Sequence, residues 1–346
     1  MADMTLMEKI VSLAKRRGFI FPGSEIYGGL AGTYDYGSKG VVLKENIERL
    51  WLQMFRDDRD DMYGVDAAIL MNPKIWEASG HVAGFSDPLI ECEECKRRFR
   101  ADHLAGLARC PDCGGPLPLG PARQFNMMFK THAGAAEDDS ATVYLRPETA
   151  GGIFANYKNV MDSEHPKLPF GIAQIGKAFR NEIAPRDFIF RLRELSQMEV
   201  EYFIHPSEWE QAFEEWRKVM HLFAKAIGLP DTMVHELEVA DGDRAHYSKR
   251  TIDFEFDYPF GRKELWGLAY RTDFDLSAHE KGSGVSQGYL DEETKEKFTP
   301  HVIEPSLGVD RTVLAVDGSS SKRNLRVMDF QRDLRSTRLR VKLRVN

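Results

Sequence analysis

Apolar and polar residues alternate along the chain with two distinct periods. A period near 3.6 predicts amphipathic helices over residues 1–19, 41–58 and 206–229. The last of these carries a stripe of large apolar side chains, which we expect to pack on a core and not to hold a cofactor: Trp209, Phe213, Trp216, Met220 and Phe223. A shorter helix is expected at 310–318, and residues 141–161 predict a strand, a turn and a helix.

Short alternating or apolar runs, bounded by turn residues, predict strands. The predicted strands are residues 62–76, 168–183, 188–204, 251–260, 263–274 and 300–309. The first of them should end at a turn before Pro73. Because several antiparallel strands are interleaved with helices, we expect the α+β fold class, with an antiparallel sheet flanked by helices.

The strands at 168–183 and 188–204 should form a hairpin with its turn at 184–187, and they carry many opposed charges. In the second strand, polar residues share one parity: Arg191, Arg193, Gln197, Glu199 and Glu201. Apolar residues share the other: Phe190, Leu192, Met198, Val200 and Tyr202. One face should therefore pack on a core while the other displays charge. Glu194 breaks the alternation, which predicts a local bulge or a turned strand.

Cross-strand ion pairing explains part of this charged array. Guanidinium groups interspersed with carboxylates also suit a polyanion that carries amino groups, since planar paired donors bind phosphate oxygens well. The pattern therefore favours a binding site for a triphosphate, an adenine and a substrate ammonium group.

The chain has 346 residues, enough for one large or two medium domains, and its apolar and charged fractions are typical of a globular protein. Since no apolar run could span a bilayer and residues 1–19 lack a signal-peptide core, we expect a cytoplasmic protein without membrane contact. The formal net charge of −7 is uneven, because nine Lys/Arg and two Asp from Gly318 onward make that end +7 and the rest −14. A basic tail can bind nucleic acid, although a solvated end segment is the commoner meaning.

All four cysteines lie in one window as two C-x2-C pairs, Cys92 with Cys95 and Cys110 with Cys113. Two such pairs supply the four thiolates of a tetrahedral zinc site. Two disulfides are the alternative, which a cytoplasmic protein rarely keeps. The pattern predicts a zinc-ribbon insertion over residues 89–122 with a structural Zn²⁺, because no open ligand position for catalysis is evident.

The charged hairpin and one later segment resemble a known family. FRNE and FRLRE (179–182 and 190–194) are similar to motif 2 of the class II aminoacyl-tRNA synthetases, and EPSLGVDR (304–311) is similar to their motif 3. With SEIYGG, YDYG, SGH, FNMMFKT, YLRPETA, IGKAFRNEI and RTDFDL, the resemblance is to the glycine-specific, homodimeric type, over about residues 5–315. It implies activation of glycine by ATP, transfer to tRNA(Gly), and a motif 1 region near 41–69 that builds a dimer interface.

The resemblance also implies which residues bind ATP. Arg180 would hold the α-phosphate and the substrate carboxylate, Glu182 and Glu194 would bind the nucleotide, and Arg191 would reach the outer phosphates. Arg311 would clamp the γ-phosphate and lie against the adenine, so that Arg180, Glu182 and Arg311 are the expected catalytic residues. Glu264 is the expected Mg²⁺ ligand. The full expected ATP set is Arg180, Asn181, Glu182, Phe190, Arg191, Leu192, Arg193, Glu194, Leu195, Glu264, Leu265, Gly308, Val309, Asp310 and Arg311.

Glycine has no side chain, so its selection must rest on its ammonium group and on crowding of its α-carbon. The resemblance assigns the ammonium group to Glu148, Glu304 and Ser306, with Gln197 and Glu199 lining the same pocket. The full expected glycine set is Arg100, Glu148, Leu195, Ser196, Gln197, Met198, Glu199, Glu304, Pro305, Ser306, Leu307 and Gly308.

Three features depart from the family's pattern. Leu195, followed by Ser196, stands where an aromatic residue commonly stacks on adenine, and the missing π face would cost ~1 kcal/mol of nucleotide binding. Gly151 stands where a glutamine is usual. The chain also ends shortly after motif 3, where the family continues into an anticodon-binding domain.

We therefore expect four segments along the chain. Residues 1–88 would form the N-terminal helix and the motif 1 part of the catalytic domain, before the insertion at 89–122. Residues 123–316 would form the core with motifs 2 and 3, and 317–346 a basic tail without an anticodon-binding domain.

Two other functions share much of this pattern. One is an adenylate-forming paralogue that passes glycine to a non-tRNA acceptor such as a carrier protein. The other is a non-catalytic accessory protein, like the mitochondrial DNA polymerase accessory protein, which resembles this family. The presence of Arg180, Glu182, Glu194 and Arg311 together argues against the second, because a binding module has no use for the whole ATP set.

Overall fold

The computed structural model describes residues 4–104, 106–117, 122–135 and 138–319. The basic tail predicted for 317–346 lies outside the described residues from 320 onward. In the described part of the chain, no helix combines the length and the hydrophobicity that a bilayer crossing requires.

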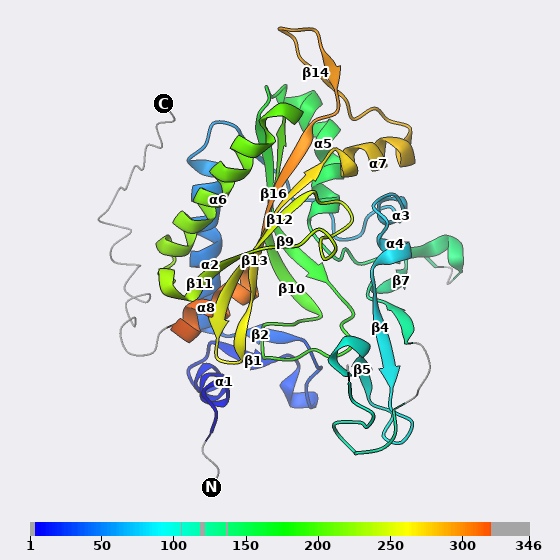
Figure 1. Ribbon diagram of the computed structural model, residues 1–346, viewed down its shortest axis with the longest axis vertical. Coiled ribbons are helices and arrows are strands. Elements are labelled where there is room, and N and C mark those ends of the chain that lie inside the picture. Colours follow the sequence, from blue (N-terminus) through cyan, green and yellow to red (C-terminus); the bar gives the residue numbers. More distant parts are fainter. Residues whose placement is uncertain (1–3, 105, 118–121, 136–137, 320–346) are drawn as a thin grey trace.

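A seven-stranded sheet forms the centre of the protein (Figure 1). Its strands, in spatial order, are β11 (Val234–Glu238), β12 (Arg250–Tyr258), β13 (Gly261–Thr272), β16 (His301–Gly308), β10 (Glu194–Ile204), β9 (Phe170–Phe179) and β3 (Met62–Gly64). Neighbours are antiparallel except β3 and β9, which are parallel. β16, the last strand along the described chain, lies between β13 and β10. The predicted α+β fold class, an antiparallel sheet flanked by helices, is confirmed.

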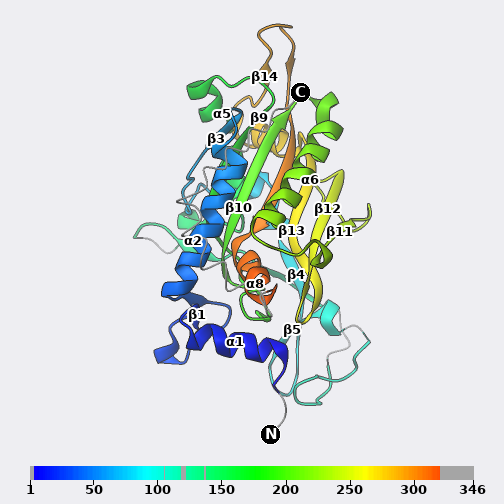
Figure 2. The same ribbon diagram turned by 90° about the vertical axis from the view of Figure 1, so that its left-hand side faces the viewer.

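Three helices cover one face of the sheet (Figure 2): α2 (Ser38–Leu52), α6 (Trp209–Ala226) and α8 (Val309–Ser319). The stripe predicted for α6 is core, since four of its five residues are at most 1% exposed: Phe213, Trp216, Met220 and Phe223. α2 continues through a π-type turn at Gln53–Asp57, and α1 (Leu6–Arg16) precedes it along the chain.

The opposite face is covered by α5 (Ala150–Glu164) and α7 (Phe274–Ser283), beside the short helices α3 (Lys74–Ala78) and α4 (His81–Gly84). A second core joins Phe154 and Tyr157 of α5 to Phe203 of β10. Phe203 has the odd parity of β10 and Met198 the even parity, and they lie in different cores. The predicted division of β10 into two faces therefore holds, but the polar face is not displayed to solvent, because helices pack on both sides of the sheet.

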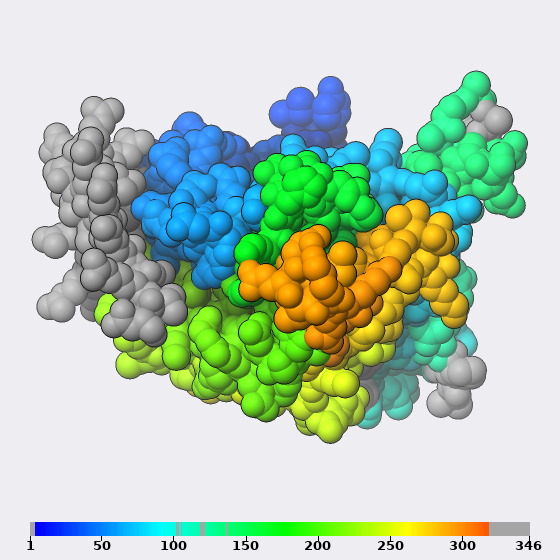
Figure 3. All heavy atoms as spheres, turned by 90° about the horizontal axis from the view of Figure 1, so that it is seen from above, coloured from blue at the N-terminus to red at the C-terminus, as the bar shows by residue number. Residues whose placement is uncertain are grey.

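Four smaller β units surround the sheet. They are β1 (Ile20–Pro22) with β2 (Tyr34–Tyr36); β4 (Ser86–Glu91) with β5 (Arg98–Arg100) and β6 (Arg123–Asn126); β7 (Lys130–His132) with β8 (Thr142–Tyr144); and β14 (Tyr289–Leu290) with β15 (Lys297–Phe298). The β14–β15 hairpin stands at one end of the molecule, in orange in Figure 3. The three-stranded unit carries the cysteines and extends beyond 89–122 on both sides.

Three details of the predicted strands are wrong. The strand expected from 188 starts only at Glu194, and the turn lies at residues 187–190 instead of the predicted 184–187. Asp187 and Phe188 adopt left-handed conformations (φ of 58° and 59°), and the turn is closed by a bridge between Arg186 and Arg191. No bulge occurs at Glu194, since β10 pairs with β9 without interruption from Glu194 to Phe203. Glu194 is exposed because it is the first residue of β10. Of the strand expected at 62–76, only Met62–Gly64 forms a strand, Leu70 makes an isolated bridge with Leu145, and Pro73 is the N-cap of helix α3.

Candidate active site

A cavity of about 460 Å³ lies over β10, β13 and β16, within the size range of small-molecule sites. The motif 2 loop between β9 and β10 closes one side of it, and the loop before β12 closes another. The predicted residues that line the cavity are Arg100, Glu148, Arg180, Glu182, Phe190, Arg191, Leu192, Leu195, Ser196, Gln197, Glu199, Glu264, Leu265, Glu304, Ser306, Gly308, Asp310 and Arg311. The structure therefore brings together most of the residues that the resemblance implied.

The predicted residues that do not line the cavity are Asn181, Arg193, Glu194, Met198, Pro305, Leu307 and Val309. Strand pleating explains several of them, because successive side chains point to opposite faces. Met198 and Leu307 are fully buried in the core under α6. Glu194 forms an ion pair with Lys177 at 3.0 Å on the surface. Arg193 donates to the carbonyl oxygens of Glu182 (3.1 Å) and Ala31 (3.0 Å), so it fixes the motif 2 loop.

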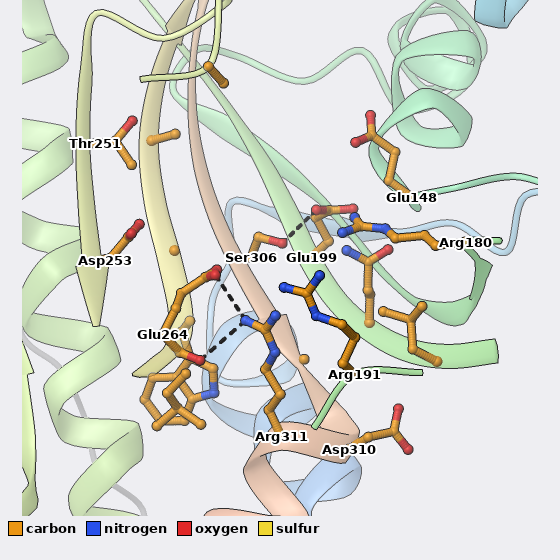
Figure 4. Close-up of a pocket in the computed structure, with 18 of the residues that line it drawn as sticks. Glu148, Arg180, Arg191, Glu199, Thr251, Asp253, Glu264, Ser306, Asp310 and Arg311 are labelled. Carbon is orange, nitrogen blue, oxygen red and sulfur yellow. Dashed lines mark hydrogen bonds and ion pairs between the residues drawn. The ribbon is translucent and has the colours of Figure 1, made fainter. Parts of the chain in front are cut away.

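Three guanidinium groups point into the cavity (Figure 4). Arg180 donates from Nε to the Pro147 carbonyl oxygen (3.0 Å). Arg191 pairs with Glu182, with Nη1 3.3 Å from Oε2. Each contact uses only part of a guanidinium, which has five N–H donors in all.

Arg311 is held more tightly. Its Nη1 is 3.0 Å from the Glu264 carboxylate and 3.2 Å from the Glu264 carbonyl oxygen, and its guanidinium lies 4.6 Å from the centre of the Phe190 ring. The charge of Arg311 lowers the pKa of Glu264. Asp253 on β12 lines the same wall, and burial together with the charge of Glu264 raises the pKa of Asp253 to about 6. This second carboxylate was not predicted from the sequence.

Glutamates form the other part of the cavity. Glu199 accepts from the Ser306 hydroxyl at 2.7 Å (Figure 4) and from the Thr149 hydroxyl. Glu148 lies 3.4 Å from Nε2 of His81. Burial opposes ionisation of Glu148, but the charges of His81, Arg271 and Arg180 outweigh it and lower its pKa to about 2. This part of the cavity is therefore an anionic pocket.

A buried arginine, Arg271, holds a third glutamate of the pocket, Glu304. Arg271 is 1% exposed, donates to both Asp275 oxygens (2.7 and 2.8 Å) and to Glu304 (2.8 Å), and lies 3.7 Å from the centre of the Tyr247 ring. Burial, partly offset by Arg271, raises the pKa of Glu304 to about 8. Sequence reasoning missed the roles of these supporting residues, although RTDFDL holds Arg271 and Asp275 four residues apart and SGH ends in His81.

Asp310 and Ser196 form hydrogen bonds that hold the elements around the site together. The Asp310 carboxylate accepts from the Ser196 N–H (2.8 Å) and from the Tyr36 hydroxyl (2.5 Å), and it points away from the three guanidiniums in Figure 4. Lys44 of α2 donates to the Ser196 hydroxyl at 2.9 Å. These bonds attach α8, β10 and α2 to one another behind the cavity.

The glycine at position 151 has a local explanation. Gly151 is buried in the first turn of α5, and a Cβ placed there would lie 2.7 Å from Cζ3 and 2.9 Å from Cη2 of Trp76. Trp76 is fully buried and also packs against His81. Its ring occupies the space that a larger residue 151 would need.

The four cysteines converge in the insertion. Their Sγ atoms all lie within 4.8 Å of one another, with Cys92 3.6 Å from Cys113 and Cys95 3.7 Å from Cys110. The four thiols are not joined in disulfides, since the two closest Sγ pairs are farther apart than the ~2.05 Å of an S–S bond. Four thiolates about 2.3 Å from one zinc ion would be ~3.8 Å apart. The donor set fits tetrahedral zinc.

Comparisons with known proteins agree with this geometry. Residues 129–319 match the model of the tRNA synthetase class II core domain (G, H, P, S and T). A prolyl-tRNA synthetase from Cryptosporidium parvum, solved with L-proline and AMP, aligns with 90% of this chain and 51% of its own at a TM-score of 0.61 and 12% identity, which shows a common fold.

Closer relatives share much more of the sequence. Glycine–tRNA ligase from Alkaliphilus oremlandii is 49% identical over 91% of this chain and 74% of its own. Those from Lachnospira eligens and Geobacillus kaustophilus are 50% and 48% identical over 89% of this chain and 73% of their own. This chain thus belongs to the glycine–tRNA ligases, within the class II aminoacyl-tRNA synthetases.

Proposed function

We propose that the cavity activates glycine with ATP and then passes the glycyl group to tRNA(Gly), in the cytoplasm. One observation carries the proposal: three guanidinium groups and an anionic pocket meet in a single cavity (Figure 4). The names of the relatives support the same reaction.

In the first step a glycine carboxylate oxygen attacks the α-phosphorus of ATP, the bond to the β-phosphate oxygen breaks, and glycyl-adenylate and pyrophosphate form. This in-line displacement requires positioning and charge compensation more than a protein nucleophile. Arg180 is assigned to the α-phosphate and the glycine carboxylate, and Arg191 and Arg311 to the outer phosphates. In the second step a hydroxyl of the terminal adenosine of the tRNA attacks the glycyl carbonyl and AMP leaves.

The anionic pocket is assigned to the ammonium group of glycine. Glu148 and Glu199 supply carboxylates, and the Ser306 hydroxyl fixes Glu199. A buried ammonium group is stable only when it is paired and hydrogen-bonded. The same groups would bind any α-amino acid, so exclusion of larger ones rests on space around the α-carbon.

Mg²⁺ is assigned to the wall that carries Asp253 and Glu264, because hard cations prefer carboxylate and phosphate oxygens. Bound there with ATP, the ion would supply charge neutralisation at the phosphates. Asp253 has its pKa raised to about 6, so it offers an ionised oxygen at neutral pH and loses that charge as the pH falls below 6.

The test is ATP–pyrophosphate exchange that depends on glycine, followed by charging of tRNA(Gly). Arg311→Ala should abolish exchange, whereas Arg262→Ala, a matched control at a surface ion pair with Asp257, should not. No exchange by the unmodified protein would exclude both enzymatic functions and favour an accessory role. Exchange without charging would favour the paralogue with another acceptor.

We also assign a structural Zn²⁺ to Cys92, Cys95, Cys110 and Cys113. The Sγ spacing and the Gly115 N–H that points at Cys113 Sγ (3.4 Å) support it. Metal analysis should find one zinc per chain, and Cys110→Ser should lose it. Protein with intact thiols and no zinc would contradict the assignment.

Finally, we propose a homodimer. Large apolar side chains are exposed in the loop after β1 and at the start of α2: Ile26 (89%), Tyr27 (88%), Val41 (38%) and Val42 (40%). Exposed apolar residues of this size favour a contact surface. Sedimentation at micromolar concentration should give twice the chain mass, and a monomer at every concentration would refute the proposal.

A further inference from the structure

One buried acid next to the anionic pocket has no role in the proposed chemistry. Glu201 of β10 is 0% exposed, and within the described residues neither oxygen of its carboxyl has a hydrogen-bond partner. It lies two residues from Glu199 on the same face of the strand. The β10–β16 register, which pairs Glu199 with Ser306 and Tyr202 with Ile303, places Glu201 opposite Glu304. One oxygen from each of Glu199, Glu201 and Glu304 lies within 4.8 Å of the others.

Three ionised carboxylates cannot share so small a buried space. A buried carboxylate without hydrogen bonds is strongly disfavoured, and like charges at this distance disfavour it further. The charged groups near Glu201 are Glu199 on its own strand, Glu304 on β16, Arg271 on β13 and Asp275 on α7. On β9 the residue opposite it is Ile172.

Arg271 cannot neutralise Glu201. It already donates to both oxygens of Asp275 and to Glu304, so its single charge faces two acids before Glu201 is counted. Burial, and then the charge of Glu304, raises the pKa of Glu201 well above its usual value.

We propose that Glu201 keeps its proton as the neutral acid and that its O–H donates a hydrogen bond to the neighbouring carboxyl group of Glu199 or Glu304, which makes Glu201 a positioning residue for the ammonium pocket. The inference rests on the proposed function for its consequence in glycine binding. A neutral Glu201 satisfies its own O–H and spares the pocket one negative charge. It also orients the carboxyl group that accepts its hydrogen bond without itself touching the substrate.

Glu201→Gln tests the proton directly, since glutamine has nearly the same shape and keeps a donor but cannot ionise. Below pH 4.5, the pKa of a glutamate in the unfolded chain, Glu201 is protonated in both the folded and the unfolded state, so folding takes up no proton at this residue. Between this pH and the higher pKa of Glu201 in the folded protein, the unfolded chain loses the proton, so that folding must take one up. The free energy of unfolding therefore falls as the pH rises through this range. The folded-to-unfolded ratio of the unmodified protein should therefore fall by up to about tenfold per pH unit relative to Glu201→Gln between pH 6 and 8.

The control is Glu215→Gln on the exposed face of α6, which should leave this pH dependence unchanged. Equal pH dependence of the unmodified protein and Glu201→Gln would show that the acid is not held neutral, and would overturn the proposal. This measurement needs no enzymatic activity, so it stands even if the proposed reaction fails.

The role in the pocket is tested by the KM for glycine in the exchange assay. Glu201→Gln should stay within about tenfold of the unmodified protein, whereas Glu201→Ala, which removes the donor, should raise the KM for glycine much more than the KM for ATP. If Glu201→Gln were as impaired as Glu201→Ala, an ionised Glu201 would be binding the ammonium group itself, and the proposal would be wrong. Urea unfolding of each variant separates these effects from misfolding.

Discussion

Gly151→Ala probes the contact between α5 and the Trp76 ring. The new methyl group would lie 2.7 Å from Cζ3 of Trp76 and 2.9 Å from Cη2. The ring is fully buried, and it packs against His81 with ring centres 5.6 Å apart. Since His81 lies beside Glu148, a displaced ring also disturbs the anionic pocket.

Two effects of opposite sign set the magnitude. Alanine is about 1 kcal/mol more favourable than glycine in a helix interior, and this is the upper limit of the gain at Gly151 in the first turn of α5. Overpacking a core by one methyl group costs ~1–3 kcal/mol. We expect Gly151→Ala to lower the free energy of unfolding by roughly 0–2 kcal/mol, with the steric cost partly hidden by the helix propensity.

Gly84 serves as a matched control that lets the steric cost at Gly151 be measured separately. At Gly84, the last residue of α4, an added methyl group would meet no other atom within 4 Å, so Gly84→Ala keeps any gain without the clash. Urea unfolding at equilibrium should place Gly151→Ala ~1–3 kcal/mol below Gly84→Ala. The KM for glycine should rise in Gly151→Ala alone.

Trp76→Phe completes a double-mutant cycle, because phenylalanine lacks the fused second ring that the methyl group meets. The combined variant should be more stable than the sum of the single changes predicts, by ~1 kcal/mol or more. Equal stability of Gly151→Ala and Gly84→Ala, or strict additivity in the cycle, would refute the steric explanation of Gly151.

Two further substitutions test the two halves of the cavity. Arg271→Met leaves Asp275 and Glu304 buried without their cation, and urea unfolding should show that the free energy of unfolding falls by ~3–5 kcal/mol. A fall of less than about 1 kcal/mol would mean that Arg271 does not stabilise these two acids as described. Leu195→Phe places an aromatic face on the cavity wall, and calorimetric titration should show ATP binding tighter by ~1 kcal/mol, about fivefold; unchanged affinity would mean that the adenine does not lie against residue 195.

The strand periodicity was the part of the fold most accessible from the sequence. Pleating fixes which side chains share a face, so the alternation in 190–204 separated Glu199 from Met198 correctly. The start of the strand was not accessible. Phe188 and Phe190 favour extended structure. The backbone at Asp187 and Phe188 is nevertheless left-handed, and the loop continues until β10 begins at Glu194. Tertiary contacts of the loop, such as Arg193 with the Ala31 carbonyl, decide this, and local preference does not show them.

The cavity shows the same limit. The resemblance to motifs 2 and 3 led to Arg180, Arg191 and Arg311, because guanidinium groups that bind phosphate lie in these recognisable segments. The residues that hold the acids in place come from elsewhere in the chain. His81 meets Glu148, which comes much later in the sequence, and Arg271 meets Glu304. No local sequence pattern identifies a pair so distant in sequence, and the sequence alone does not distinguish a buried arginine from an exposed one.

The position of β16 in the sheet has a consequence for how the protein is made. β9 pairs with β10, and β11 to β13 pair in sequence. Among the described strands only β16, later in the chain than all of them, connects the two groups. During synthesis, a chain that has not reached His301 carries two incomplete sheets whose open edges can pair wrongly. Glu304, Ser306 and Arg311 arrive on that strand and the helix after it, so no partial chain has either half of the cavity complete. The ability to bind substrates should therefore appear abruptly, once the growing chain extends past Arg311.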